Sequence, residues 1–119
     1  MITHIVCWKY KAETTQDQRN EHISRLRSLS DRISAIRSLS VGADVVRLER
    51  SFDTGLVAIF DDLAGLNEYT VDPLHQEVAA FGKEIAERAI SVDFESQKAQ
   101  RPRHDAPRLA GGNKPNRGL

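Results

Sequence analysis

The sequence has one cysteine, few aromatic residues and no long apolar run. Because Cys7 is the only cysteine among 119 residues, no intrachain disulfide can form, and a reducing, cytoplasmic compartment is expected. No basic start leads into an apolar segment, so neither a signal peptide nor a membrane span is expected. The length fits one domain of ordinary size.

Net charge is lacking too, since 17 Lys and Arg residues balance 17 Asp and Glu residues. The charges are unevenly placed: residues 97–119 hold six basic residues and one acidic residue, so residues 1–96 carry a net charge of −5. An acidic domain gives no support to a role in binding nucleic acid.

The last 23 residues are rich in Lys, Arg, Pro, Gly and Asn and have little apolar content. Such a segment cannot bury enough surface to offset the entropy of ordering, so residues 97–119 are expected to form a disordered basic tail after a domain of residues 1–96. A basic arm for nucleic acid is the alternative, although no aromatic residue is interleaved with the charges.

Four segments have the apolar patterns of β-strands. Residues 2–10 and 55–60 are apolar on both faces, which is typical of strands covered on both sides. Residues 39–45 and 90–95 alternate between apolar and polar side chains, which predicts one buried face for each. The buried face of residues 39–45 is expected to include Val45.

The first strand is expected to carry a histidine on a buried face. Even-numbered positions place these side chains together: Ile2, His4, Val6, Trp8 and Tyr10. A buried polar group without a partner is destabilising, so His4 is expected to have a hydrogen-bond partner.

A long amphipathic helix is predicted after the first strand. Thr15 and Gln18 have the spacing of a capping box. An apolar stripe then runs from Ile23 to Ile36 at alternating spacings of three and four. His22 is placed on the wet side of this helix, and it is interpreted, like His104 in the tail, as a surface residue.

The segment from Tyr69 to Val78 has the features of a pocket. Leu63, Leu66 and Tyr69 predict a short helix, and Pro73 is expected to end it and let a new helix start. The buried face of the new helix is expected to carry Leu74, Val78, Phe81 and Ile85, with His75 at its border. Tyr69 and His75 both have a polar end, and both would point to the core at a break in the backbone. The alternative is that they are half-buried packing residues.

The order of elements is β-α-β-β-α-β with the last helical region divided at Pro73, which predicts a ferredoxin-like α+β fold with an antiparallel four-stranded sheet. In that arrangement the first and third strands are central, in agreement with their two apolar faces. Helices cover only one face of such a sheet, so a second copy of the sheet is expected to cover the other in a homodimer.

Three segments resemble the stress-responsive α/β-barrel (Dabb) family: residues 4–10, 36–45 and 69–78, the last with Pro73 and His75. The resemblance covers about residues 1–96. It implies a dimeric α+β barrel in which two ferredoxin-like sheets face each other. Many members have no assigned activity and are described as stress-related.

The resemblance also implies a site. A plant branch of similar fold cyclises linear polyketides with a tyrosine and a histidine between helices and sheet. Those positions match Tyr69 and His75 here, and a histidine of the first strand matches His4. A ligand pocket is therefore expected to be lined by these residues: His4, Val6, Trp8, Tyr69, His75, Val78 and Phe81.

Three functions are compatible with this pocket. The first is a stress-related protein that binds a small hydrophobic or aromatic ligand. The second is a cyclase-like or isomerase-like enzyme in which His75 takes a proton and the Tyr69 hydroxyl stabilises an enolate, with no metal and no cofactor. The third is a structural stress protein whose dimer surface or basic tail binds a partner. A metal site at His4 and His75 is a further alternative, but no helical pair of ligands fixes its geometry.

Overall fold

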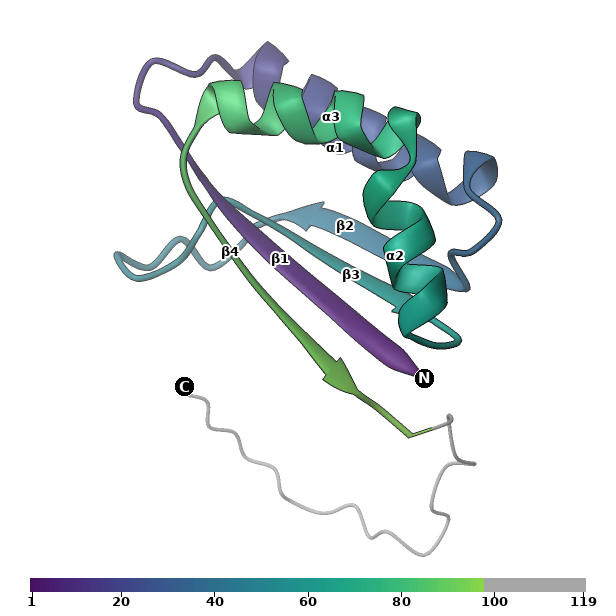
Figure 1. Ribbon diagram of the computed structural model, residues 1–119. Coiled ribbons are helices and arrows are strands. Elements are labelled where there is room, and N and C mark those ends of the chain that lie inside the picture. Colours follow the sequence, from purple (N-terminus) through teal and green to yellow (C-terminus); the bar gives the residue numbers. More distant parts are fainter. Residues whose placement is uncertain (98–119) are drawn as a thin grey trace, which may run out of the picture.

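The computed structural model describes residues 1–97, so the predicted tail and His104 lie outside the described residues apart from Gln97. Its elements follow the order β-α-β-β-α-α-β (Figure 1). They are β1 (Ile2–Tyr10), α1 (Gln16–Arg32), β2 (Ser38–Ala43), β3 (Thr54–Phe60), α2 (Leu63–Val71), α3 (Pro73–Ile85) and β4 (Ala86–Glu95). Within residues 1–97, no helix combines the length and the apolar content needed to cross a membrane.

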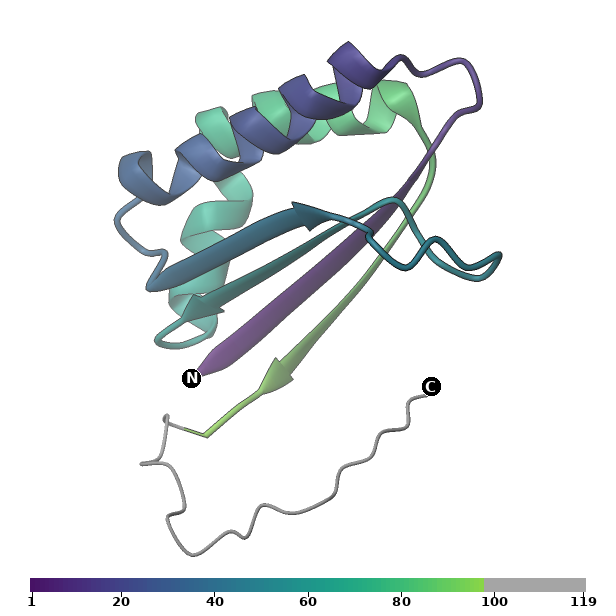
Figure 2. The ribbon, with the colours of Figure 1, turned by 180° about the vertical axis from the view of Figure 1, so that it is seen from behind.

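The four strands form one sheet in the order β2-β3-β1-β4, and each neighbouring pair is antiparallel. The predicted ferredoxin-like fold is therefore confirmed, with the first and third strands at the centre. All three helices lie over the same face of the sheet, as two opposite views show (Figure 1, Figure 2). The even-numbered side chains of β1 point to this covered face, where Ile2 and Tyr10 are buried.

Helix α1 begins at the predicted cap. The Thr15 hydroxyl accepts a hydrogen bond from the Gln18 backbone N–H, and the Gln18 side chain accepts one from the Thr15 N–H. The placement of His22 on the wet side is wrong, because His22 is 0% exposed. The buried face of α1 is His22, Leu26 and Leu29, at i, i+4 and i+7.

The break at Pro73 is confirmed. Helix α2 ends at Val71, and Asp72 is extended with φ −64° and ψ 130°. The Asp72 carboxylate accepts a hydrogen bond from the Leu74 N–H at 2.8 Å and so caps α3. Leu63 is 67% exposed, contrary to the apolar face predicted for this helix, because it immediately follows the Asp62 cap and lies beside solvent.

The core lies between the sheet and the helices. Its buried members include Ile2, Leu26, Leu29, Ile33, Ile36, Val41, Leu56, Ala58, Phe60, Tyr69 and Val78. Val45 is not among them: it is 85% exposed, because β2 ends at Ala43 and the chain turns away at Asp44. The predicted buried position of Val45 is therefore wrong.

The opposite face of the sheet is apolar, and no helix within residues 1–97 covers it (Figure 1). Register places Ile5 beside Val57 and Val92, and Cys7 beside Ile90, so these side chains share that face. Val57 is 40% exposed, and Ile90, Val92 and Phe94 are similarly open. Large contiguous apolar patches on a protein surface mark interaction sites.

Candidate functional site

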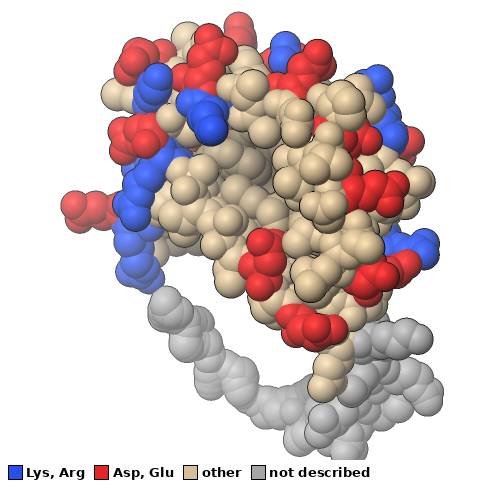
Figure 3. All heavy atoms as spheres, viewed as in Figure 1, with Lys and Arg blue, Asp and Glu red and all other residues tan. Residues whose placement is uncertain are grey.

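A cavity of about 410 Å³ lies between the covered face of the sheet and the helices. This volume falls within the roughly 300–1,000 Å³ of typical small-molecule pockets. Figure 3 shows a hollow on this side of the molecule, surrounded mainly by uncharged side chains. Five of the seven predicted pocket residues line the cavity: His4, Val6, Trp8, Tyr69 and His75.

Tyr69 and His75 approach each other across the break between two helices. Tyr69 is in the last turn of α2 and only 2% exposed, and His75 is in the first turn of α3. Their ring centroids are 4.1 Å apart. Pro73 makes this possible, because it ends α2 and redirects the chain so that both side chains reach the same space.

His4 of β1 completes the group. Its ring meets the edge of the Tyr69 ring, with centroids 5.8 Å apart. The predicted hydrogen-bond partner of His4 is present: the Nδ1 atom pairs with the Asp93 carboxylate of β4. Residues 4 and 93 are directly opposite in the β1–β4 ladder, which brings the two side chains to the same face.

The hydrogen bonds set which nitrogen of each ring is free. A carbonyl oxygen only accepts, so the contact of 3.3 Å between His75 Nδ1 and the Thr70 carbonyl requires Nδ1 to donate. His4 Nδ1 donates to the Asp93 carboxylate by the same argument. In a neutral His75 ring the Nε2 atom therefore carries a lone pair.

The pKa shifts keep His75 and Tyr69 neutral. Burial lowers the pKa of His75, with a smaller opposing effect from its hydrogen bond to Thr70 and a further lowering from His4. Burial raises the pKa of Tyr69 to about 12, so its hydroxyl keeps its proton. That hydroxyl makes no hydrogen bond within residues 1–97. The site thus offers one free donor, the Tyr69 hydroxyl, and one free acceptor, Nε2 of His75.

Trp8 leaves the cavity open. It is four residues from His4 along an extended strand, or about 13 Å at roughly 3.3 Å per residue. Its ring packs against His22, with centroids 4.8 Å apart and an interplanar angle of 88°. The space between Trp8 and His4 is therefore part of the cavity, which both side chains line.

Two predicted pocket residues are not brought to the cavity. Val78 is buried in the core. Phe81 packs against His22 on one side and under the Arg25 guanidinium on the other, 4.4 Å from its ring centroid. Both follow the helical stripe that predicted their burial, but the cavity lies beside that stripe, at Ala79 and Lys83.

Sequence reasoning missed His22 and Asp93. The spacing of His22 to Leu26 and Leu29 is a signal for the first, because i, i+4 and i+7 share one helix face. Asp93 has no such signal, since its contact with His4 depends on the register of two strands that are distant in the sequence.

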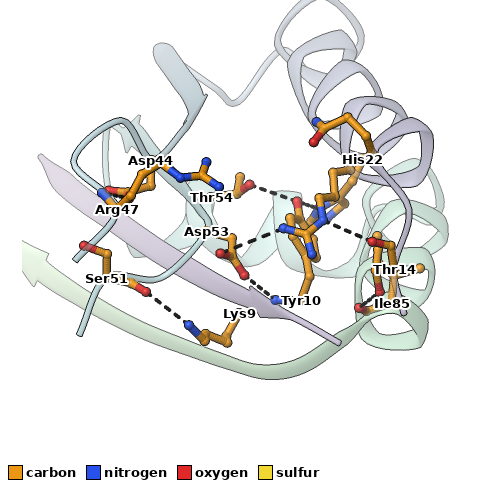
Figure 4. Close-up of polar contacts among 12 residues, drawn as sticks. Lys9, Tyr10, Thr14, His22, Asp44, Arg47, Ser51, Asp53, Thr54 and Ile85 are labelled. Carbon is orange, nitrogen blue, oxygen red and sulfur yellow. Dashed lines mark hydrogen bonds and ion pairs between the residues drawn. The ribbon is translucent and has the colours of Figure 1, made fainter. Parts of the chain in front are cut away.

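A second cavity, of about 230 Å³, has mainly polar walls and is lined by Tyr10, by Asp53 and by other residues of the loop between β2 and β3. Asp53 accepts a hydrogen bond from the Tyr10 N–H at 2.8 Å and pairs with Arg19 at 3.9 Å (Figure 4). The Asp44 carboxylate accepts from the Arg47 N–H. Asp53 thus holds the loop between β2 and β3 to β1 and α1, whereas Asp44 stabilises a turn within that loop. Among the described residues, no cluster of three or more His, Cys, Asp or Glu side chains has the arrangement of a metal site.

Comparison with known proteins gives a family and a set of similar folds. The family model of the stress responsive A/B barrel domain matches residues 2–96. The comparison with curated protein sequences found no match.

The solved structures similar to this chain are ferredoxin-like proteins. A dimeric protein of unknown function from Thermobifida fusca YX is 26% identical, with a TM-score of 0.72 over 78% of this chain and 88% of that one. A dimeric protein of unknown function from Bacteroides fragilis is 24% identical, with a TM-score of 0.71 over 80% and 95%. A hydroxynitrile lyase from Passiflora edulis is 17% identical, with a TM-score of 0.73 over 84% and 96%.

Proposed function

The chain belongs to the stress responsive A/B barrel domain family, and from that membership and the cavity at His4, Tyr69 and His75 we propose that it binds a small, largely apolar ligand with a phenolic or carbonyl oxygen. The observation that carries this proposal is Tyr69, which is 2% exposed and lines the cavity, and whose hydroxyl makes no hydrogen bond within residues 1–97. A phenol O–H is a strong donor, and an oxygen of a ligand in the cavity can accept from it.

The chemistry of the three side chains favours an oxygen at one end of the ligand. A phenolic hydroxyl can accept from Tyr69 and donate to the Nε2 lone pair of His75. A carbonyl oxygen can accept from Tyr69 alone. The rest of the cavity has apolar walls, including Val6, Leu26 and Ala79, which suit an aromatic or aliphatic body.

The experiment is a calorimetric titration of the full chain with 4-propylphenol. Tyr69→Phe and His75→Ala are each expected to weaken binding about 2- to 12-fold, since a neutral hydrogen bond contributes about 0.5–1.5 kcal/mol. Tyr10→Phe is the matched control, because it removes the only other tyrosine hydroxyl and Tyr10 does not line this cavity. Equal affinities for the wild type, Tyr69→Phe and His75→Ala would refute the proposed site.

An enzyme is the second candidate, favoured by the contact of Tyr69 with His75. A neutral His75 Nε2 can take a proton from a carbon beside a carbonyl, and the protonated Tyr69 hydroxyl can stabilise the enolate that forms. The hydroxynitrile lyase from Passiflora edulis is a precedent for catalysis on this fold. Deuterium exchange from the α-carbon of a 1,3-diketone probe, faster with wild type than with His75→Ala, would support turnover.

We also propose that the chain forms a homodimer through the uncovered face of the sheet. The similar proteins from Thermobifida fusca and Bacteroides fragilis are described as dimeric. Here Val57, Val92 and Phe94 give that face the apolar surface that a second copy would bury. Sedimentation of the full chain tests this proposal, and a stable monomer would overturn it.

A cytoplasmic location is proposed from the single cysteine, Cys7, which is free and half-buried. A role in stress is proposed from the family description alone. Cell fractionation and growth of a deletion strain under stress test these two points.

A further inference from the structure

The sheet side of the cavity is elongated along β1. Strands β1 and β4 form it from pairs of residues that are opposite each other in the ladder: His4 with Asp93, Val6 with Ser91, and Trp8 with Ala89. These pairs follow one another along the strands. A ligand that fills the cavity therefore extends from the His4 end towards the Trp8 end.

Helix α3 forms another wall, with a cation at its far end. Its lining residues are His75, Ala79 and Lys83, at i, i+4 and i+8, and thus on one face of the helix. Eight residues of α-helix span about 12 Å at 1.5 Å per residue. The last turn of α3 lies at the Trp8 end, because a Cβ atom built on Gly82 would be 3.4 Å from Trp8 Nε1. Lys83 therefore lies at the end of the cavity away from His75.

The ammonium group of Lys83 is available to a ligand. Among the described residues that line the cavity, Lys83 is the one Lys or Arg. Its side chain is exposed, and it makes no ion pair or hydrogen bond with any of residues 1–97. An ammonium group is a strong partner for a carboxylate, which accepts charge-assisted hydrogen bonds.

The His4 end of the cavity does not suit a second acidic group. The Asp93 carboxylate lies there, and its pairing with His4 leaves that end without a net positive charge. Residues 1–96 as a whole carry a net charge of −5, so an anionic ligand needs a cation close by. The charges of the cavity therefore favour an acidic group at Lys83 and an uncharged oxygen at Tyr69.

We propose that Lys83 binds a carboxylate at the far end of the ligand. The proposal rests on the proposed ligand-binding function and extends it to a ligand class: an elongated acid with an apolar body, whose other end carries a phenolic or carbonyl oxygen. The apolar body lies between the two ends, beside Val6 and Ala79.

The test compares two probes of nearly equal shape, 4-(4-hydroxyphenyl)butanoic acid and its amide, by calorimetric titration of the full chain at neutral pH. Lys83→Gln removes the charge and keeps most of the side chain. The ratio of acid affinity to amide affinity is expected to be about 2- to 5-fold higher in the wild type than in Lys83→Gln, the size of a solvent-exposed ion pair.

Two further variants separate direct contact from other effects of the charge. Lys11→Gln removes one positive charge from the same domain but lies outside this cavity, so it should keep the wild-type ratio. Lys83→Arg keeps the charge and should restore the ratio. Lys83 is also in the last turn of α3, where a cation stabilises a helix. Loss of that effect would change the affinity for both probes alike and leave their ratio unchanged.

The outcomes separate the two proposals. If 4-propylphenol binds the wild type but the acid-to-amide ratio is the same in the wild type and Lys83→Gln, Lys83 is not a ligand contact, while the pocket stands. Equal falls of the ratio in Lys83→Gln and Lys11→Gln would also overturn the assignment, because they would show a long-range effect of charge. If neither 4-propylphenol nor the two longer probes bind the wild type, both proposals fail.

Discussion

Burial of His22 makes the stability of the protein depend on pH. The pKa of His22 is lowered from 6.5 to about 4 by loss of solvation. In the unfolded chain His22 therefore binds a proton below about pH 6.5, while in the folded chain it stays neutral down to about pH 4. Because the unfolded state binds more protons in this window, the free energy of unfolding rises with pH.

The size of the effect follows from the same shift. One pKa unit corresponds to 1.36 kcal/mol, so about 2.5 units predict that wild type loses about 3 kcal/mol between pH 7 and pH 4 through this residue. The titratable groups facing His22 are Tyr10, with Arg19 and Asp53 beyond it, and Lys83 in the cavity. None of them is a cause of the His22 shift, which arises from burial alone.

The assay is urea unfolding at a fixed protein concentration across pH 4–8, on the wild type and His22→Phe. The variant should lose most of the pH dependence between pH 4 and 6.5, while a smaller slope of the same sign remains from His75, whose pKa is also lowered. His75→Phe is the matched control and should keep the larger part of the slope. Parallel curves for the wild type and His22→Phe, or an NMR titration of His22 near pH 6.5, would refute the reasoning.

Three further predictions concern the assembly, the tail and a helix cap. Val57→Asp places a charge on the apolar sheet face and should weaken dimerisation, measured by sedimentation, by about 100-fold or more. Val45→Asp is the control, because Val45 is 85% exposed and its replacement should leave dimerisation unchanged. Equal effects of the two substitutions would contradict the sheet-face dimer. Truncation after Gln97 should change the melting temperature by only a few degrees, and a large drop would show that the tail packs on the domain. Thr15→Ala removes the hydroxyl that caps α1 at Gln18 and should lower the free energy of unfolding by about 1 kcal/mol, which corresponds to a fall of roughly 4–8 °C in melting temperature. An unchanged melting temperature would count against the cap.

The fold was predictable because its strands differ in pattern according to their place. Residues 2–10 and 55–60, which are apolar on both faces, form the two central strands. One face of each strand packs against the helices, and the other lies on the side of the sheet that the helices leave uncovered. The end of β2 was not predictable from alternation. Val45 continues the pattern, but the Asp44 N–H donates to the Asp53 carbonyl and the strand stops.

The position of His22 shows why a helical stripe leaves a choice of phase. A stripe through Ile23 and a stripe through His22 share the later members Leu26, Leu29 and Ile33, so spacing alone supports both. The more apolar residue is the natural choice. Tertiary packing decides otherwise, because Tyr10 supplies a hydrogen bond and Trp8 a ring for the buried histidine.

The candidate site was predictable in part. Pro73 marks a helix break in the sequence, and Tyr69 and His75 flank it, so their approach follows from local structure. His4 joins them through the fold. Asp93 could not be foreseen, because its place opposite His4 depends on strand register, which local patterns do not determine.

The most direct test of the pocket is a crystal structure of the full chain soaked with 4-propylphenol. The phenol oxygen is expected within about 2.6–3.2 Å of Tyr69 Oη and of Nε2 of His75, with the propyl chain directed to Trp8. A structure in which the Trp8 ring fills the space between His4 and His75, or in which the probe binds only outside this cavity, would contradict the proposed function.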